Sequence, residues 1–165
     1  QKAPLLLQMG VEPAVIDVFD FAGLKELLAG IRPEIVIHQL TDLPYALDAS
    51  QMTAALARNA RLRDVGTRNL VAAALHAGAR RLIAQSISFI YDEGAKPHRE
   101  TDPLLPVTHA VYGETVQGVL SLERQVTEAA LEVGYNSLSH FSAAFHETFG
   151  CCPGLYPLKL PGRKS

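Results

Sequence analysis

The side chains best placed to do chemistry lie on one predicted helix near the C-terminus. The side of this helix that its apolar positions leave exposed carries Ser139, His140, Ala143 and His146, with Ser142 nearby. Ser and His can donate hydrogen bonds to base edges in a DNA groove. The commonest base-specific contact is an Arg or Lys to guanine, and this helix has neither residue. The exposed side of this helix therefore offers polar hydrogen-bonding groups but no cation.

Two short predicted helices position these side chains. Gly134 suits the left-handed turn that ends the first helix, and Asn136-Ser137 supplies an N-cap for the second. The apolar positions at helical spacing are Val126, Ala129, Ala130 and Val133 in the first helix, and Leu138, Phe141, Phe145 and Phe149 in the second. Two amphipathic helices joined by a glycine-containing turn are typical of a helix-turn-helix that places its second helix in a major groove.

Other reactive constellations have little support. Cys151 and Cys152 are adjacent, so they lack the two- to four-residue spacing that lets two thiolates hold one ion, and a structural role without a metal is predicted. The chain has no GxSxG, GKS/T or HExxH motif. Nucleophile-elbow hydrolases, P-loop NTPases and zinc peptidases of the HExxH type are therefore not indicated.

Composition indicates a globular protein without a basic footprint for nucleic acid. The formal net charge is −2, with 15 Lys and Arg against 17 Asp and Glu over 165 residues. We interpret Arg58, Arg61, Arg63 and Arg68 as a solvated helix side.

No apolar stretch approaches the ~20 residues that span a bilayer. The paired cysteines suit a reducing compartment, so a cytoplasmic location without membrane contact is expected. The missing initiator Met suggests that residue 1 is not the natural start.

Before Val126 the hydrophobic pattern is that of an α/β protein. It predicts strands at Ala14–Val18, Glu34–Leu40 and Arg81–Ser86, and helices at Leu24–Ala29 and Ala49–Ala77, with Gly78 as a C-terminal signal of the second helix. Apolar runs of this kind, buried on both faces and separated by helices, favour a parallel sheet with crossover helices.

The segment from Gly134 to Tyr156 resembles the second helix-turn-helix of the AraC/XylS family of transcription regulators. Its closing phrase, Phe149-Gly150 followed by Pro153 and Tyr156, also fits that family. The resemblance implies DNA as a partner and base contacts from the second helix. The candidate DNA-binding residues are Ser137, Leu138, Ser139, His140, Ser142, Ala143 and His146. Phosphate contacts would come from backbone N–H groups at the helix start and from Lys159, Arg163 and Lys164.

The preceding part, from about Gly10 to Val126, resembles the NAD-dependent epimerase/dehydratase family, the extended short-chain dehydrogenases. The resemblance rests on DVFD (17–20), VIHQL (36–40), GTRNLVAAALHAGARRLIAQS (66–86), Tyr91 and HRETDPLLP (98–106). It implies a Rossmann-like fold and NAD or NADP as cofactor. The implied cofactor-binding residues are Asp17 and Val18 at the adenine, and His38, Gln39, Leu40 and Thr41 along the dinucleotide. Ser86 and Ser88 would border the substrate, and Tyr112 would be the acid/base of a Tyr-x-x-x-Lys motif.

Two departures from that family argue against an active enzyme. The chain has no GxGxxG, the turn whose backbone N–H groups hold the pyrophosphate, and the first strand, its turn and its helix are absent rather than mutated. Val116 stands where the family has the Lys that activates the Tyr. Tight NAD or NADP binding is therefore not expected. Alternatives stay open for Ser86 and Ser88, which could simply end a strand and bond the backbone, and for His38, which could be a packed residue.

Taken together, the sequence predicts an α/β fold, a partial Rossmann-like parallel sheet with helices over residues 1–125, followed by an all-α helix-turn-helix fragment and tail over 126–165. The predicted function is a DNA-binding transcription regulator with a catalytically inactive epimerase-like domain. One alternative is an NAD(P)-dependent epimerase, dehydratase or reductase, completed by a homo-oligomer or by an N-terminal segment outside this chain. Another is a non-functional gene fusion.

Overall fold

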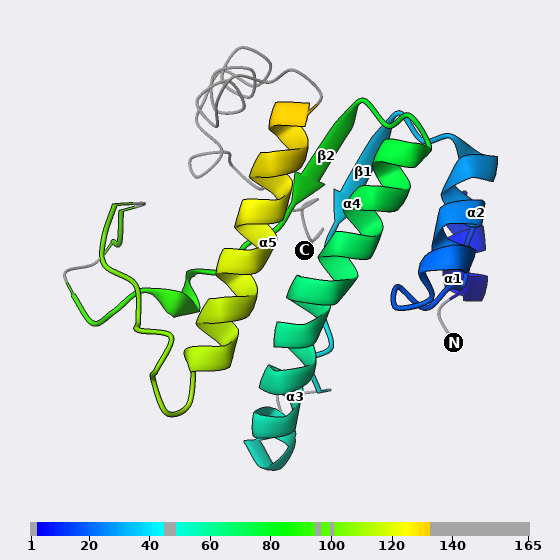
Figure 1. The fold of residues 1–165 in the computed structure, drawn as a ribbon. Coiled ribbons are helices and arrows are strands. Elements are labelled where there is room, and N and C mark those ends of the chain that lie inside the picture. The colour runs from blue at the N-terminus through cyan, green and yellow to red at the C-terminus, as the bar shows by residue number, and fades with distance from the viewer. Residues whose placement is uncertain (1–2, 45–48, 95–96, 100, 133–165) are drawn as a thin grey trace, which may run out of the picture. The chain divides into compact units, whose positions relative to one another are not determined.

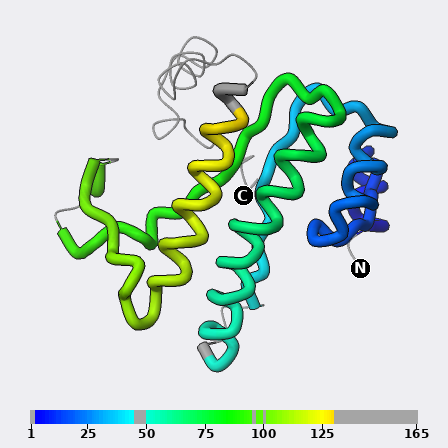
Figure 2. The backbone as a smooth tube through the Cα atoms, in the orientation of Figure 1, coloured from blue at the N-terminus to red at the C-terminus, as the bar shows by residue number. Residues whose placement is uncertain are grey.

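The structure is a computed structural model that describes residues 3–44, 49–94, 97–99 and 101–132. Its elements in chain order are α1 (Ala3–Gln8), α2 (Phe21–Ile31), β1 (Ile35–His38), α3 (Ala49–Arg61), the π-helical turn η2 (Leu62–Gly66), α4 (Thr67–His76), β2 (Arg81–Ala84), the 3-10 turn η3 (Ser88–Ile90) and α5 (Gly113–Glu132). The chain divides into two compact units, residues 1–126 and 127–165. The first unit is a mixed α/β structure, and its described part is shown in Figures 1 and 2.

The sheet of this unit contains two described strands. β1 and β2 pair in parallel, with Ile35 opposite Arg81 and His38 opposite Ala84. Parallel neighbours need a crossover connection, and the helical rod formed by α3, η2 and α4 supplies it alongside the strands (Figure 1). Both strands lie inside the predicted ranges, and the rod covers the predicted Ala49–Ala77 helix. Those predictions are confirmed.

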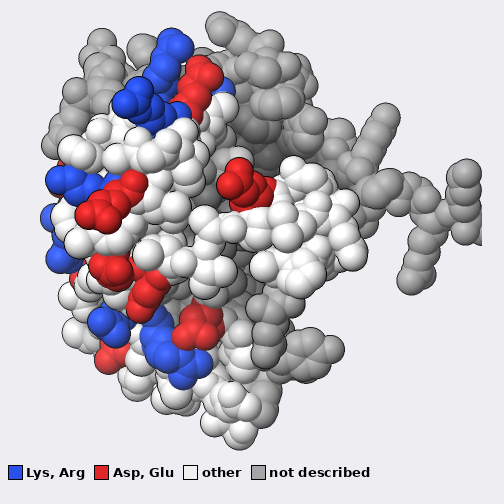
Figure 3. Space-filling model, turned by 90° about the vertical axis from the view of Figure 1, so that its right-hand side faces the viewer, with Lys and Arg blue, Asp and Glu red and all other residues white. Residues whose placement is uncertain are grey.

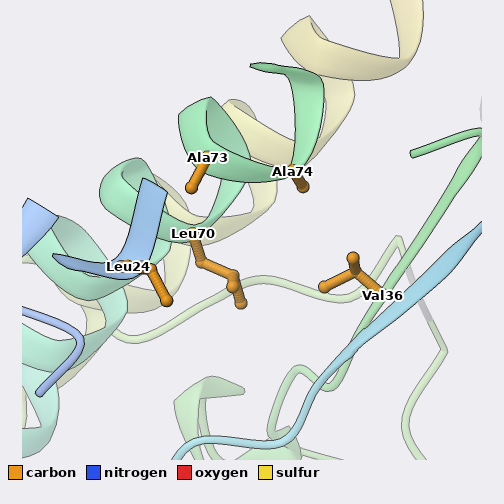
Figure 4. Packing of buried hydrophobic residues seen from close by; sticks show 5 residues of the cluster. All are labelled: Leu24, Val36, Leu70, Ala73 and Ala74. Atoms are coloured by element: carbon orange, nitrogen blue, oxygen red, sulfur yellow. The ribbon is translucent and has the colours of Figure 1, made fainter. Parts of the chain in front are cut away.

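Helices α2 and α4 cover one face of the sheet. Leu24 of α2 and Leu70 of α4 meet Val36 of β1 in one buried cluster, with Ala73 and Ala74 beside them. Figure 4 shows Leu70 pointing into the space between Leu24 and Val36. Each of these side chains is shielded from water by the others. The hydrophobic effect therefore stabilises the packing of α2, α4 and β1 against one another.

Local signals in the sequence explain where these helices begin and end. Asp20 accepts a hydrogen bond from the Gly23 N–H and so caps α2. The rod ends as predicted at Gly78, whose φ of +78° is a left-handed conformation that glycine adopts without a Cβ clash.

The strand predicted at Ala14–Val18 is wrong, because this segment is irregular and ends in a turn. The Asp17 carboxylate accepts the Phe19 N–H at 2.9 Å, and Val15 is 93% exposed. A strand needs a neighbour for its ladder, and neither described strand pairs with this segment. The short polar side chain of Asp17 instead satisfies a turn, as Asx residues commonly do.

The prediction that the strands are buried on both faces is also wrong for β1. Val36 and His38 are buried, but Ile35 is 47% and Ile37 is 62% exposed. Helices α2 and α4 pack on the side of β1 that Val36 faces. The sequence run looks uniformly apolar, so periodicity could not reveal which face lacks a cover.

Candidate functional site

The candidate site in the first unit lies at the carboxyl ends of β1 and β2. Parallel strands end at the same edge of a sheet, and α/β proteins commonly bind ligands there. β1 ends at His38 and β2 at Ala84, two residues before Ser86. The backbone N–H of Gln85 donates to the His38 carbonyl at 3.1 Å and ties these two ends together.

His38 is a buried, fully hydrogen-bonded residue, 2% exposed. Its Nδ1 accepts the Leu40 N–H at 3.3 Å, so the neutral ring carries its proton on Nε2, which lies 2.9 Å from Thr67 Oγ1. Burial is the main cause that lowers the pKa of His38 below 6.5. The nearby Arg63 charge lowers it further, against a hydrogen bond to the residue's own backbone. Of the two alternatives, the structure supports a packed residue.

The loop after β1 is held in place by Asn59 of α3. The Asn59 carbonyl oxygen accepts from the Asp42 N–H at 2.9 Å and from Thr41 Oγ1 at 3.2 Å. The Asn59 amide donates to the carbonyls of Asp42 and Ala55, each at 2.8 Å. Because Asn59 is buried and uses both ends of its amide, the loop that contains the predicted contacts Gln39, Leu40 and Thr41 is fixed against α3.

Asp17 and Val18 precede α2, and Val18 lies near the N-terminal end of α4. The Val18 carbonyl accepts from Asn69 of α4 at 2.9 Å, and Val18 lies beside Gly66 at the start of that helix. Thr67, the partner of His38, is the next residue of the chain. The structure thus brings Val18 and His38 to the same end of α4, although the Asp17 carboxylate is occupied by the Phe19 N–H.

The three predicted catalytic hydroxyls do not form a constellation in the described residues. Ser86 Oγ donates to Glu123 of α5 at 2.6 Å. Ser88 is exposed at the start of η3, and the Tyr112 ring stacks on His109 with centroids 5.5 Å apart. No hydrogen bond among the described residues joins either serine to Tyr112. The alternative that these serines bond the backbone does not hold for Ser86, whose partner is a carboxylate.

Val116 occupies a core position rather than a cofactor-facing one. It is 1% exposed and packs with Ile90 and Val119, against which Leu104 and Leu105 also lie. A Lys at position 116, as in the Tyr-x-x-x-Lys motif, would place its ammonium group among these apolar side chains. The replacement of Lys by Val therefore matches the local packing.

Sequence reasoning missed a polar network around Asp64 in the π-helical turn. The Asp64 carboxylate accepts from Ser121 Oγ at 2.7 Å and from Arg68 at 3.1 Å, and the Asp64 carbonyl accepts from Gln125 at 3.1 Å. Together with the Ser86–Glu123 bond, it fastens residues 121–125 of α5 to the α/β unit. The only signal in the sequence was that Ser121 and Gln125 are four residues apart, which places them on one helix face.

The predicted DNA-binding residues, Ser137 to His146, lie outside the described residues, as do Cys151 and Cys152. Among the described residues, no group of three or more His, Cys, Asp or Glu side chains could hold a metal ion. Within the same part of the chain, no helix has both the length and the apolarity needed to cross a membrane.

The C-terminal part matches a known protein family. The helix-turn-helix domain family matches residues 109–157, in agreement with the AraC-type resemblance. The matched segment begins at His109, before α5, and the part of α5 up to Val126 belongs to the first unit.

Most of the chain, including residues beyond the α/β unit, also matches a curated relative. The chain is similar to a 3-diazoavenalumate denitrifying reductase from a Streptomyces species, with 41% identity over 152 residues, an alignment that covers 89% of this chain. It covers 49% of the reductase, so the chain spans about half the length of this curated relative.

Proposed function

We propose that this protein is a DNA-binding transcription regulator of the AraC type, whose α/β unit carries a helix-turn-helix and has no catalytic role. The observation that carries the proposal is the helix-turn-helix match over residues 109–157. The apolar stripe Leu138, Phe141, Phe145 and Phe149 and the turn at Gly134 supply the local chemistry of such a motif.

The charge distribution of the described residues favours weak, weakly salt-dependent binding. Arg58, Arg68 and Arg80 are paired with Asp42, Asp64 and Glu34 respectively. On the face drawn in Figure 3, basic and acidic side chains are interspersed and form no basic patch. Few phosphates would be neutralised, so an affinity near the non-specific range of ~10⁻⁴ to 10⁻⁶ M and a shallow salt slope are expected.

Fluorescence anisotropy with random and candidate operator duplexes at two salt concentrations tests this proposal. His140→Ala should keep the fold and weaken only base-specific contacts, by about 1–3 kcal/mol where they exist. His76→Ala is the control, since His76 is an exposed residue at the end of α4. Absence of binding even at low salt would contradict the proposed function.

A second candidate function is an NAD(P)-dependent reductase or epimerase. It is favoured by the similarity to the Streptomyces reductase over 89% of this chain and by the position of His38–Thr41 and Ser86 at the carboxyl edge of the sheet. In this case another polypeptide segment supplies the glycine-rich turn. Turnover of NADH or NADPH by this chain when it is joined to a segment that supplies such a turn would favour the enzyme over the regulator.

A further inference from the structure

Arg63 differs from the other arginines of the helical rod. Arg58 pairs with Asp42 at 2.6 Å, Arg68 pairs with Asp64 at 3.1 Å, and the Arg61 guanidinium lies 4.1 Å from the centre of the Phe19 ring. For Arg63 no ion pair, hydrogen bond or ring contact is found in the described part of the chain, although its side chain is partly buried. The solvated helix side predicted from the sequence is therefore wrong at this position.

The surroundings of Arg63 favour an anion. Burial lowers the pKa of Arg63, and its charge lowers the pKa of buried His38 at the carboxyl end of β1. A guanidinium that has lost part of its hydration and gained no counter-ion is an unfavourable arrangement that a bound oxyanion would relieve. The carboxylate next to Arg63 in the chain, Asp64, is engaged by Arg68, and Asp42 is engaged by Arg58.

The backbone at Arg63 and the residues near it are held in a defined arrangement. It lies in the π-helical turn η2, which interrupts the rod between α3 and α4, and such turns occur frequently at functional sites. The neighbouring loop after β1 is fixed by Asn59, and His38 is fixed by Thr67. The carboxyl edge of a parallel sheet is where α/β proteins bind ligands.

We propose that Arg63 binds the oxyanion of a small organic ligand, a carboxylate or a phosphate, at the carboxyl end of β1. The planar guanidinium can donate two parallel hydrogen bonds to such a group. This site belongs to the α/β unit, and it does not depend on the helix-turn-helix or on catalysis.

The experiment is a calorimetric titration of the full 165-residue chain with three probes: cinnamate, phenyl phosphate and the neutral analogue cinnamamide. At least one anion should bind about 10-fold or more tightly than the amide, because a charge-assisted contact is lost with the amide. The two anions distinguish a carboxylate site from a phosphate site, and either result supports the proposal. Equal, weak binding of all three probes would overturn it.

Matched variants locate the contact. Arg63→Gln should weaken anion binding about 10-fold, whereas Arg68→Gln, which removes an exposed ion-paired arginine of the same rod, should change it less than about 2-fold. Equal effects of both variants would mean that binding is general charge attraction and would overturn the proposal. If Arg63→Gln does not fold, the Arg63 side-chain N–H signal of the wild-type chain, assigned with Arg63→Lys, should shift on adding the anion; an unchanged signal overturns the proposal.

Discussion

At the scale of single residues, His38 couples the stability of the α/β unit to pH. Its folded-state pKa lies below the ordinary value of 6.5, so below about pH 6.5 the unfolded chain takes up a proton that the native state resists. The contribution is fully present above pH 6.5 and is lost as the pH falls, with a slope of up to about 1.4 kcal/mol per pH unit. Protonation of Nδ1 would also oppose the Leu40 N–H that it now accepts.

Urea unfolding of the wild type and His38→Asn between pH 5 and 8 checks this prediction. The free energy of unfolding of the wild type should fall more steeply below pH 6.5 than that of the variant. His76→Gln removes an exposed histidine instead and should retain the wild-type slope. Identical pH profiles for all three proteins would show that His38 does not carry the effect.

A second prediction at this scale concerns Val116. Because Val116 is 1% exposed among Ile90 and Val119, Val116→Lys places an unpaired charge in the core and should destabilise the chain by about 3–5 kcal/mol. Val116→Met adds length without charge and should cost only about 1–3 kcal/mol. Thermal unfolding compares the two variants. A Lys variant as stable as the Met variant would show that position 116 tolerates a charge, and reduction of a sugar nucleotide by the Lys variant would favour the enzyme hypothesis.

At the scale of elements, the packing of α5 on α3 depends on Gly118. A Cβ at this position would lie 2.9 Å from Ala60 Cα and 3.0 Å from the Ala60 carbonyl oxygen. Ala has a higher helix propensity than Gly, which would favour the variant by about 1 kcal/mol. This gain is opposed by the cost of moving the Ala60 backbone away from the added Cβ. We predict that Gly118→Ala destabilises the chain by about 1–3 kcal/mol.

Gly30→Ala is the matched control, because it changes another helical glycine with no atom within 4 Å of the added Cβ. It should stabilise the chain by about 0.5–1 kcal/mol through helix propensity alone. Opposite signs for the two variants in denaturant unfolding are the expected result. A stabilising Gly118→Ala would mean that α5 does not contact α3 this closely.

The elements also show what the sequence could predict. Apolar runs with helix signals located β1, β2, α2 and the long rod, because these features depend on local chemistry and one shared core around Leu70. Ala14–Val18 has the same β-branched composition but no partner. Strand propensity without a neighbour is not sufficient.

The candidate site was less predictable than the fold. His38 and Thr41 were placed correctly at a strand end, but their partners Thr67 and Asn59 are 29 and 18 residues away in sequence. Whether Arg63 has a carboxylate partner depends on which side chains the π-helical turn places near its guanidinium. Such information belongs to tertiary packing and not to residue spacing.

At the scale of the whole molecule, the helix-turn-helix should depend on its two central phenylalanines. Phe145→Ala or Phe141→Ala removes a predicted core anchor, which should cost about 3–5 kcal/mol and abolish DNA binding. His98→Ala, in the α/β unit, should leave binding unchanged. Anisotropy titrations measure this outcome, and full DNA binding by either Phe variant would show that the predicted apolar stripe is not the core of the motif.

The same scale decides whether the chain can hold a dinucleotide. No GxGxxG is present, so the backbone N–H groups that would face a pyrophosphate are not provided, and contacts near Asp17 and His38–Thr41 would act alone. We predict that NAD and NADP bind to this chain more weakly than about 10 µM, a binding free energy less favourable than about −7 kcal/mol. Isothermal titration calorimetry with both nucleotides measures this affinity, with adenosine as the control for adenine contacts alone. NAD bound no better than adenosine would mean that the pyrophosphate adds nothing. A dissociation constant below 10 µM that adenosine does not match would mean that the chain contacts the pyrophosphate by another route and that the α/β unit is a working cofactor domain.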